Sequence, residues 1–200
     1  MLARRAENTR LHHRYQDRDF DKAAVKILPG SYYVTGDDML IVTVLGSCVS
    51  VCLHDPVNGI GGMNHFMLPE HGGDPGSHFS GAARYGAYAM EILINDLLKL
   101  GAERKHFTAK VFGAGKVLSG VGDIGQRNAV FALDYLQREK IALLAKDVGD
   151  IYPRKVYFFP QTGRVVVRLL RNIAAEAITT ERTYGKRIDS VPVGGAVDLF

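Results

Sequence analysis

The sequence predicts an α/β fold in which a β-sheet sandwich is covered by two long helices. Short β-branched segments separated by glycine and proline turns indicate strands, and two segments repeat apolar residues at intervals of three and four, as helices do. No change in composition divides the 200 residues into two domains. Hydrophobic residues make up 46% of the chain and charged residues 23%, which excludes a mainly disordered or fibrous protein.

Strands are expected first. Residues 39–45 are apolar and β-branched, Gly46-Ser47 interrupts them, and residues 49–53 are again extended in character. The sequence from Asp55 to Gly59 is a strong turn signal, so residues 60–67 are expected to return as the partner strand of a hairpin.

Two helices and further strands follow. Residues 85–100 have a helical apolar stripe that ends at Gly101, and a second helix is expected from Asp123 or Gly125 to Arg138, with Asp123 as its N-cap. The remaining short apolar segments are expected to be strands: 107–112, 141–145, 155–159 and 164–170.

The ends of the chain differ from its centre. Residues 1–24 are polar, contain more basic than acidic residues and lack periodicity, so we predict a flexible basic arm. Residues 25–173 are predicted to form the folded domain, and residues 174–200 a C-terminal tail with weak periodicity. The polar, glycine-rich segment 70–81, which contains His71 and His78, is expected to be a loop that either borders a site or only connects elements.

Composition also excludes several classes of partner. The net charge is only +4, and no basic stripe is interleaved with aromatic residues, so nucleic acid is not an expected partner. The apolar runs are too short for membrane insertion, and the N-terminus has no apolar signal region. The two cysteines, Cys48 and Cys52, lie roughly 13 Å apart in a strand, too far for a disulfide. We therefore predict a reduced, cytoplasmic protein.

The sequence contains partial matches to two kinds of binding site, a nucleotide-binding glycine motif and a zinc site, but neither is complete. Gly113-Ala114-Gly115-Lys116 lacks the Ser or Thr that a phosphate loop needs at Val117 and the third glycine that a dinucleotide site needs at Leu118, so a tight turn explains it better. Zinc-ligand types are present at Cys48, Cys52, His54 and His65. In one strand Cys48 and Cys52 are too far apart to share an ion, and no metal site is predicted.

Thr43, Cys48 and His65 form the remaining constellation. Cys48 follows a strand interruption, where backbone N–H groups can converge on an oxyanion, and a hairpin would bring His65 beside it. Thr43 could then orient the imidazole. A cysteine is also often a small buried hydrophobe and a histidine a satisfied core residue, so spacing alone leaves both interpretations open. Cys52, between Val51 and Leu53, is the stronger candidate for a structural cysteine.

At this point the residues resemble the CheD family, the bacterial chemoreceptor glutamine deamidases. The resemblance extends over about residues 26–170. The motifs that carry it are TVLGSCVSVCL at 43–53, GGMNHFMLP at 61–69, RYG at 84–86, KVFGA at 110–114 and DIG at 123–125. One departure is Asp150 after Gly149, where many members of the family have a second glycine.

The resemblance implies hydrolysis of glutamine side-chain amides on methyl-accepting chemoreceptors to glutamate, with release of ammonia, as part of chemotaxis adaptation. It implies Cys48 as nucleophile, His65 as base, Thr43 as the third catalytic residue, and backbone N–H groups of Ser47 and Cys48 around the oxyanion. It implies no metal or organic cofactor. The implied fold is akin to that of the deamidating cytotoxic necrotizing factors.

Two alternatives remain open at the level of sequence. The chain could be a non-catalytic regulatory partner of a CheC-type phosphatase, or a cysteine peptidase or transglutaminase-like enzyme that attacks a different amide. The substrate-binding residues are not identified by the sequence, although the basic arm 1–24 could contact an acidic receptor surface.

Overall fold

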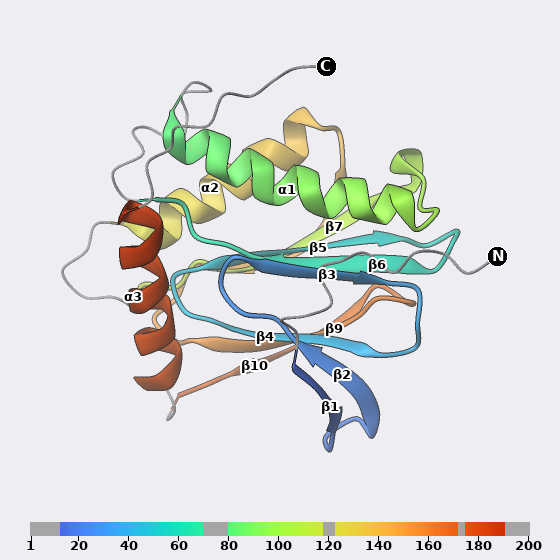
Figure 1. Cartoon of the computed structure of the whole chain (residues 1–200), viewed down its shortest axis with the longest axis horizontal. Helices are drawn as coiled ribbons and strands as arrows, with labels where there is room; N and C mark the ends of the chain where they lie inside the picture. Colours follow the sequence, from blue (N-terminus) through green and yellow to red (C-terminus); the bar gives the residue numbers. More distant parts are fainter. Residues whose placement is uncertain (1–12, 70–79, 118–122, 172–174, 191–200) are drawn as a thin grey trace.

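Two stacked β-sheets form the centre of the molecule, and helices α1 and α2 lie side by side on the outer face of one of them (Figure 1). The computed structural model describes residues 13–69, 80–117, 123–171 and 175–190. Within these ranges each sheet has five strands. The α/β class predicted from the sequence is confirmed.

The first sheet, farther from α1 and α2, has the strand order β1-β2-β4-β9-β10. Its strands are β1 (His13–Asp17), β2 (Lys22–Lys26), β4 (Leu40–Leu45), β9 (Arg154–Phe159) and β10 (Arg164–Leu169). β2 and β4 are parallel, and the other pairs are antiparallel.

The second sheet has the order β3-β6-β5-β7-β8 and packs against the helices. Its strands are β3 (Ser31–Thr35), β5 (Val49–Asp55), β6 (Ile60–His65), β7 (Thr108–Gly113) and β8 (Ala142–Val148). Only the β7–β8 pair is parallel.

The end of α1 and the beginning of α2 agree with the sequence signals, whereas α1 begins four residues earlier than the predicted stripe, at Gly81, after Ser80 as its N-cap. α1 (Gly81–Lys99) is followed by Gly101 at φ +102°, a left-handed conformation that glycine adopts without strain. α2 (Ile124–Arg138) begins after Asp123, whose side chain accepts a hydrogen bond from the amide of Gln126. A 3₁₀ turn, η2 (Arg104–His106), precedes β7. No helix in the described ranges is both long and apolar enough to cross a membrane.

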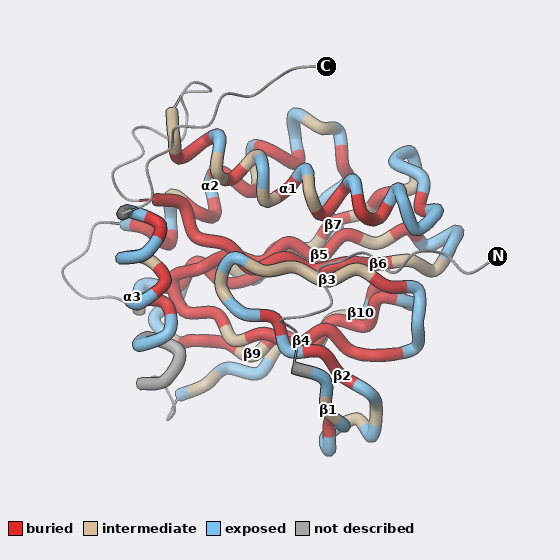
Figure 2. Tube along the Cα trace, viewed as in Figure 1, coloured by how far each residue is buried: buried red, intermediate tan, exposed pale blue. Residues whose placement is uncertain are grey.

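The central strands are buried over most of their length, shown in red in Figure 2. The side chains around β5 alternate between two buried clusters. On β5, Val49, Val51 and Leu53 face α1 and α2. Cys52 and, directly before the strand, Cys48 face the space between the sheets. The inter-sheet layer also contains Met63, Met67, Val156 and Phe158. Polar groups on the same face of β5 and β6 are therefore enclosed between two sheets.

The structure corrects the prediction for both ends of the chain. Residues 13–24 do not form a flexible arm, because they make up β1 and part of β2, and Phe20 packs edge-on against Tyr157 at 5.0 Å between ring centroids. β3 was also not expected. In the predicted tail a third helix, α3 (Ala175–Ser190), lies at one end of the two sheets (Figure 1). The remainder of the predicted arm and tail lies outside the described residues.

Candidate active site

The expected hairpin brings Cys48 and His65 together. β5 and β6 pair antiparallel with Cys52 opposite Met63, and an additional bridge joins Val49 to Phe66. In this register Cys48 and His65 lie on the same face of neighbouring strands, with exposed fractions of 0% and 1%. A ring nitrogen of His65 lies within 4.8 Å of Cys48 Sγ.

Thr43 reaches this pair from the opposite sheet. Its Oγ1 lies 2.8 Å from His65 Nδ1 and donates a hydrogen bond to the carbonyl oxygen of Ile27 at 3.0 Å. Because a hydroxyl has one proton and Ile27 accepts it, Nδ1 of His65 must be the donor toward Thr43. The neutral imidazole is thereby fixed with its proton on Nδ1 and a lone pair on Nε2. The preceding residue, Val42, has its side chain on the opposite face of the same sheet, so Thr43 and not its neighbour is the residue of this strand that orients His65.

This tautomer leaves a base available beside the thiol. His65 Nε2 is buried and has no hydrogen-bond partner among the described residues. Burial lowers the pKa of His65 to about 3, so the ring is neutral near pH 7. Burial raises the pKa of the Cys48 thiol well above its usual range, and the Glu181 carboxylate raises it further. The pair is therefore at rest as a thiol and a neutral imidazole.

A row of three amides lies at the start of this segment. The N–H groups of Gly46 and Cys48 donate to Glu181 Oε1 at 2.7 and 3.2 Å, and the N–H of Ser47 donates to Oε2 at 2.7 Å. The Ser47 hydroxyl also donates to Oε2, at 2.9 Å. Successive amides that converge in this way form an anion-binding concavity. The predicted oxyanion donors, Ser47 and Cys48, both belong to it, and Gly46 is a third.

The carbonyl groups of the same loop are anchored on its other side. Gly46 O accepts from the amide of Gly115 at 2.7 Å, and Cys48 O accepts from the amide of Ala114 at 2.6 Å. Ser47 O accepts from Asn128 Nδ2 of α2 at 2.8 Å. The amides are thus aimed by contacts that do not involve the anion they bind.

These anchors explain the glycine motif. Gly113 has φ +104°, and a Cβ atom there would lie 2.3 Å from the carbonyl oxygen of Cys48. Glycine therefore allows β7 to turn directly against the nucleophile loop, and the sequence-based preference for a tight turn is confirmed.

Glu181 of α3 is the site residue that sequence reasoning missed. It lies more than 130 positions from its amide partners, in a segment with weak helical periodicity, and it is 1% exposed. Nothing in the sequence distinguishes it from the other acidic residues that follow the predicted domain. Glu181 cannot be recognised from spacing because helix α3 is placed by tertiary contacts.

Cys48, His65 and Glu181 are also a set of metal-ligand types whose ligand atoms lie within 4.8 Å of one another. The Glu181 oxygens, however, already accept four hydrogen bonds from residues 46–48. A carboxylate has about four lone-pair positions, so these bonds use its acceptor capacity. The arrangement therefore fits an anion held by amides better than a metal ligand.

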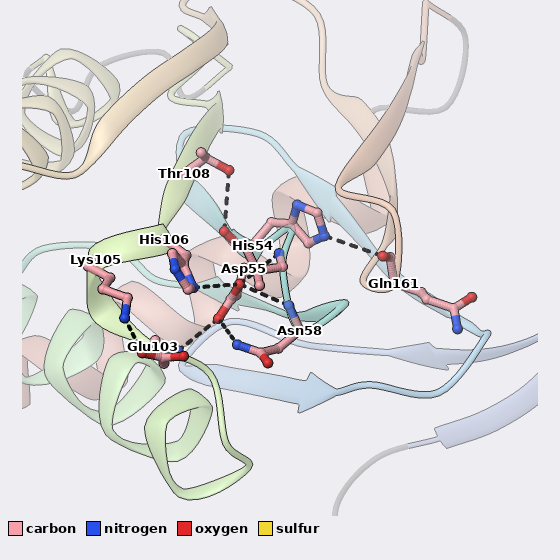
Figure 3. A network of polar contacts seen from close by, with 9 residues as sticks. His54, Asp55, Asn58, Glu103, Lys105, His106, Thr108 and Gln161 are labelled. Atoms are coloured by element: carbon pink, nitrogen blue, oxygen red, sulfur yellow. Dashed lines mark hydrogen bonds and ion pairs between the residues drawn. The ribbon is translucent and has the colours of Figure 1, made fainter.

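The other proposed zinc ligands lie elsewhere. Cys52 is buried in the inter-sheet layer opposite Met63, as a structural cysteine would be. His54 lies near the C-terminal end of β5, the end far from Cys48, where its Nε2 is 3.3 Å from the carbonyl oxygen of Gln161 (Figure 3). The four-residue zinc set considered from the sequence is therefore not assembled. His71 and His78 lie outside the described residues.

A thiol beside a hydroxyl-oriented imidazole, facing a row of amides, is the arrangement typical of cysteine-dependent amide hydrolases. Comparison with known proteins agrees with this class. Residues 67–169 match the family model described as "CheD chemotactic sensory transduction". This match and the relatives described next show that the chain belongs to the CheD family.

Several relatives align over nearly the whole chain. A "Probable chemoreceptor glutamine deamidase CheD" of Janthinobacterium sp. (strain Marseille) is 57% identical, covering 93% of both chains. The protein of that name from Thiobacillus denitrificans is 56% identical, over 93% of this chain and 94% of its own. "Probable chemoreceptor glutamine deamidase CheD 1" of Shewanella oneidensis is 56% identical, over 94% of this chain and 92% of its own.

Proposed function

We propose that this protein is an enzyme that deamidates glutamine side chains of chemoreceptors to glutamate, and that it contributes in this way to chemotaxis adaptation. The observation that carries the proposal is the row of amides from Gly46 to Cys48 beside a thiol and an imidazole base. Relatives at 56–57% identity are named chemoreceptor glutamine deamidases, and this name supports the substrate class.

In the proposed mechanism, His65 Nε2 takes the proton of Cys48, and the thiolate attacks the carbonyl carbon of the glutamine amide. The amides of residues 46–48 receive the oxyanion of the tetrahedral intermediate. The imidazolium then protonates the departing ammonia and leaves a thioester. Water, activated by the same imidazole, hydrolyses the thioester, so that one glutamine and one water give one glutamate and one ammonia. Thr43 holds the ring in the tautomer that these steps need.

Three finer points belong to the same proposal. The family resemblance supports a fold akin to the deamidating cytotoxic necrotizing factors, and the two stacked sheets with helices on one face are compatible with it. The same resemblance supports a cytoplasmic enzyme, since its substrates would be the cytoplasmic parts of receptors. A CheC-type phosphatase is an additional candidate partner, and complex formation that survives Cys48→Ser would identify it.

The proposal is tested by peptide mass spectrometry of purified receptor cytoplasmic fragments incubated with the protein. We expect site-specific conversion of glutamine to glutamate that disappears in Cys48→Ala and persists in Cys52→Ala, which removes the other buried cysteine, four residues along the chain in β5. Absence of conversion over a broad panel of receptors would contradict the proposal and favour the non-catalytic regulatory role. Cleavage or cross-linking of the fragments would instead indicate a peptidase or a transglutaminase-like enzyme.

A further inference from the structure

Helix α3 covers the candidate active site and places a carboxylate in it. Glu181 is the group bound by the amides of residues 46–48, and its Oε2 lies so close to Gly46 that a Cβ atom there would be 2.7 Å away. The carboxylate also lies near Cys48 Sγ, since their ligand atoms are within 4.8 Å. The place where an oxyanion would form is therefore filled by a side chain of the same protein.

Other side chains on the same face of α3 also pack against the domain. Tyr184, one turn after Glu181, hydrogen-bonds through its hydroxyl to Tyr85 of α1. It contacts Gly30 so closely that a Cβ atom there would lie 2.6 Å from the Tyr184 hydroxyl. Ile188, one further turn along, is 9% exposed and joins the inter-sheet layer. Spacings of three and four put these side chains on one helix face. The covered surface is therefore a helix-binding surface with an anion site within it.

The chemistry of Glu181 matches the reaction product. Deamidation of a glutamine leaves a glutamate, and Glu181 is a glutamate presented by a helix to the amides that would hold the reacting carbonyl. We propose that α3 occupies the substrate site as a built-in product-like ligand, and that a receptor helix carrying the target glutamine binds where α3 lies. This inference rests on the proposed deamidase function, and it identifies the surface that the sequence left unassigned.

Mutual exclusion follows from the contacts. The amides of residues 46–48 cannot hold both the Glu181 carboxylate and a substrate carbonyl, so α3 must leave before a glutamine can react. The loop does not need Glu181 to keep its shape, because Ala114, Gly115 and Asn128 hold its carbonyl groups. Docked α3 also keeps a negative charge beside Cys48, which disfavours the thiolate. Only the fraction of molecules with α3 displaced is competent to bind substrate.

The sharpest test converts the product-like residue into a substrate. In full-length Glu181→Gln the side chain presented to Cys48 is an amide, and we expect the protein to deamidate itself: the thiolate displaces ammonia and water then releases Cys48. Peptide mass spectrometry should find glutamate at position 181 although the gene encodes glutamine. The conversion should be absent in Glu181→Gln/Cys48→Ala. The amide introduced by Arg182→Gln, at an exposed position one residue along the same helix, should stay unconverted.

A second measurement tests competition with a receptor. Full-length Glu181→Ala should deamidate a receptor fragment several-fold faster than the unmodified chain at low substrate concentration, mainly through a lower KM, because less of the site is occupied. Asp189→Ala, which removes an exposed carboxylate of the same helix, should leave the rate unchanged.

The outcomes separate this inference from the proposed function. Suppose that receptors are deamidated, that the glutamine of Glu181→Gln stays intact and that Glu181→Ala brings no gain: the inference would be overturned and the deamidase kept. Self-conversion at position 181 without conversion of any receptor would support the inference about α3 and contradict the receptor as substrate. A rate that falls in Glu181→Ala while the variant remains folded would make Glu181 part of the working site and would also overturn the inference.

Discussion

Each end of strand β5 has a buried carboxylate that accepts four hydrogen bonds, yet the two carboxylates have different origins. At the far end, Asp55 accepts from the amides of Val57, Asn58 and Glu103 and from the Asn58 side chain, at 2.8–3.1 Å (Figure 3). At the near end, the carboxylate is Glu181, delivered by a helix more than 130 positions away.

The difference shows which carboxylate the fold requires. The partners of Asp55 lie mostly within three residues, so the turn after β5 and the carboxylate form together. The amides at the near end are aimed by carbonyl anchors on Ala114, Gly115 and Asn128, with or without Glu181. We therefore interpret Asp55 as structural and Glu181 as replaceable, and the predictions below test that distinction.

The largest expected effect is on stability. Asp55→Ala should lower the free energy of unfolding by about 3 kcal/mol, because the buried carboxylate that accepts from three backbone amides and from the Asn58 side chain is removed. Glu181→Ala should cost no more than about 1 kcal/mol, since water can enter the vacated polar site and bond to amides that stay in place. Urea denaturation of the two variants beside the unmodified chain measures both values. Equal losses would mean that Glu181 is also a structural residue.

Asp55 and Glu181 also differ in how far sequence reasoning reaches them. The turn at 55–59, the hairpin that brings Cys48 to His65, and the helices α1 and α2 follow from local periodicity and turn signals. Thr43 lies in the opposite sheet, and its place beside His65 is supported in the sequence mainly by the family resemblance. Residues close in sequence, or on adjacent strands of one hairpin, are brought together by short-range geometry.

What sequence reasoning missed depends on tertiary contacts. β1 and β2 contain polar, charged residues because they form an edge hairpin, and their packing relies on Phe20 against Tyr157 and Phe159 of another strand. α3 has weak periodicity because only three of its described residues, Glu181, Tyr184 and Ile188, are buried, and one of these is acidic. An acidic residue on a buried helix face opposes the usual pattern, and only a distant anion site compensates for it.

The next largest effect is on kcat and concerns His65, the base of β6 that lies beside the near end of β5. Thr43→Val should lower kcat of receptor deamidation by about 10- to 100-fold with little change in KM, because Nδ1 of His65 loses its acceptor and the tautomer is no longer fixed. Thr43→Ser should retain most of the activity. Thr108→Val, at the far end where the hydroxyl donates to His54 O, should leave kcat unchanged. Steady-state kinetics with a pH profile would detect an altered base, whereas a purely structural loss would leave the profile unchanged.

The two ends of β5 should also respond to acid in different pH ranges. His65 has a pKa near 3 in the folded protein against 6.5 as its ordinary value, so the unfolded chain binds its proton first, and stability falls as pH drops below about 6.5. Between pH 6.5 and pH 5 the free energy of unfolding of the unmodified chain should fall by about 1.5 kcal/mol from this cause. In His65→Gln this part of the decrease should be absent.

Asp55 titrates in a lower range. Burial alone would raise its pKa, but hydrogen bonds from Asn58 and from the amides of Glu103 and Val57 outweigh this and hold the pKa below its usual range. Its contribution is therefore present above about pH 4 and lost only in stronger acid. Asp55→Asn should leave the slope between pH 6.5 and 5 unchanged. Urea denaturation across pH measures both slopes, and a common response of the two variants would contradict the assignment of separate ranges.

The smallest expected effect concerns the histidine near Asp55. His106 Nδ1 lies 3.4 Å from Asp55 Oδ1, an arrangement that superficially resembles the histidine beside a carboxylate of an active site (Figure 3). The carboxylate already accepts four shorter bonds, so His106→Gln should change the free energy of unfolding by less than about 0.5 kcal/mol and leave deamidation unchanged. A loss above about 1 kcal/mol would mean that charge pairing rather than amide donors stabilises Asp55.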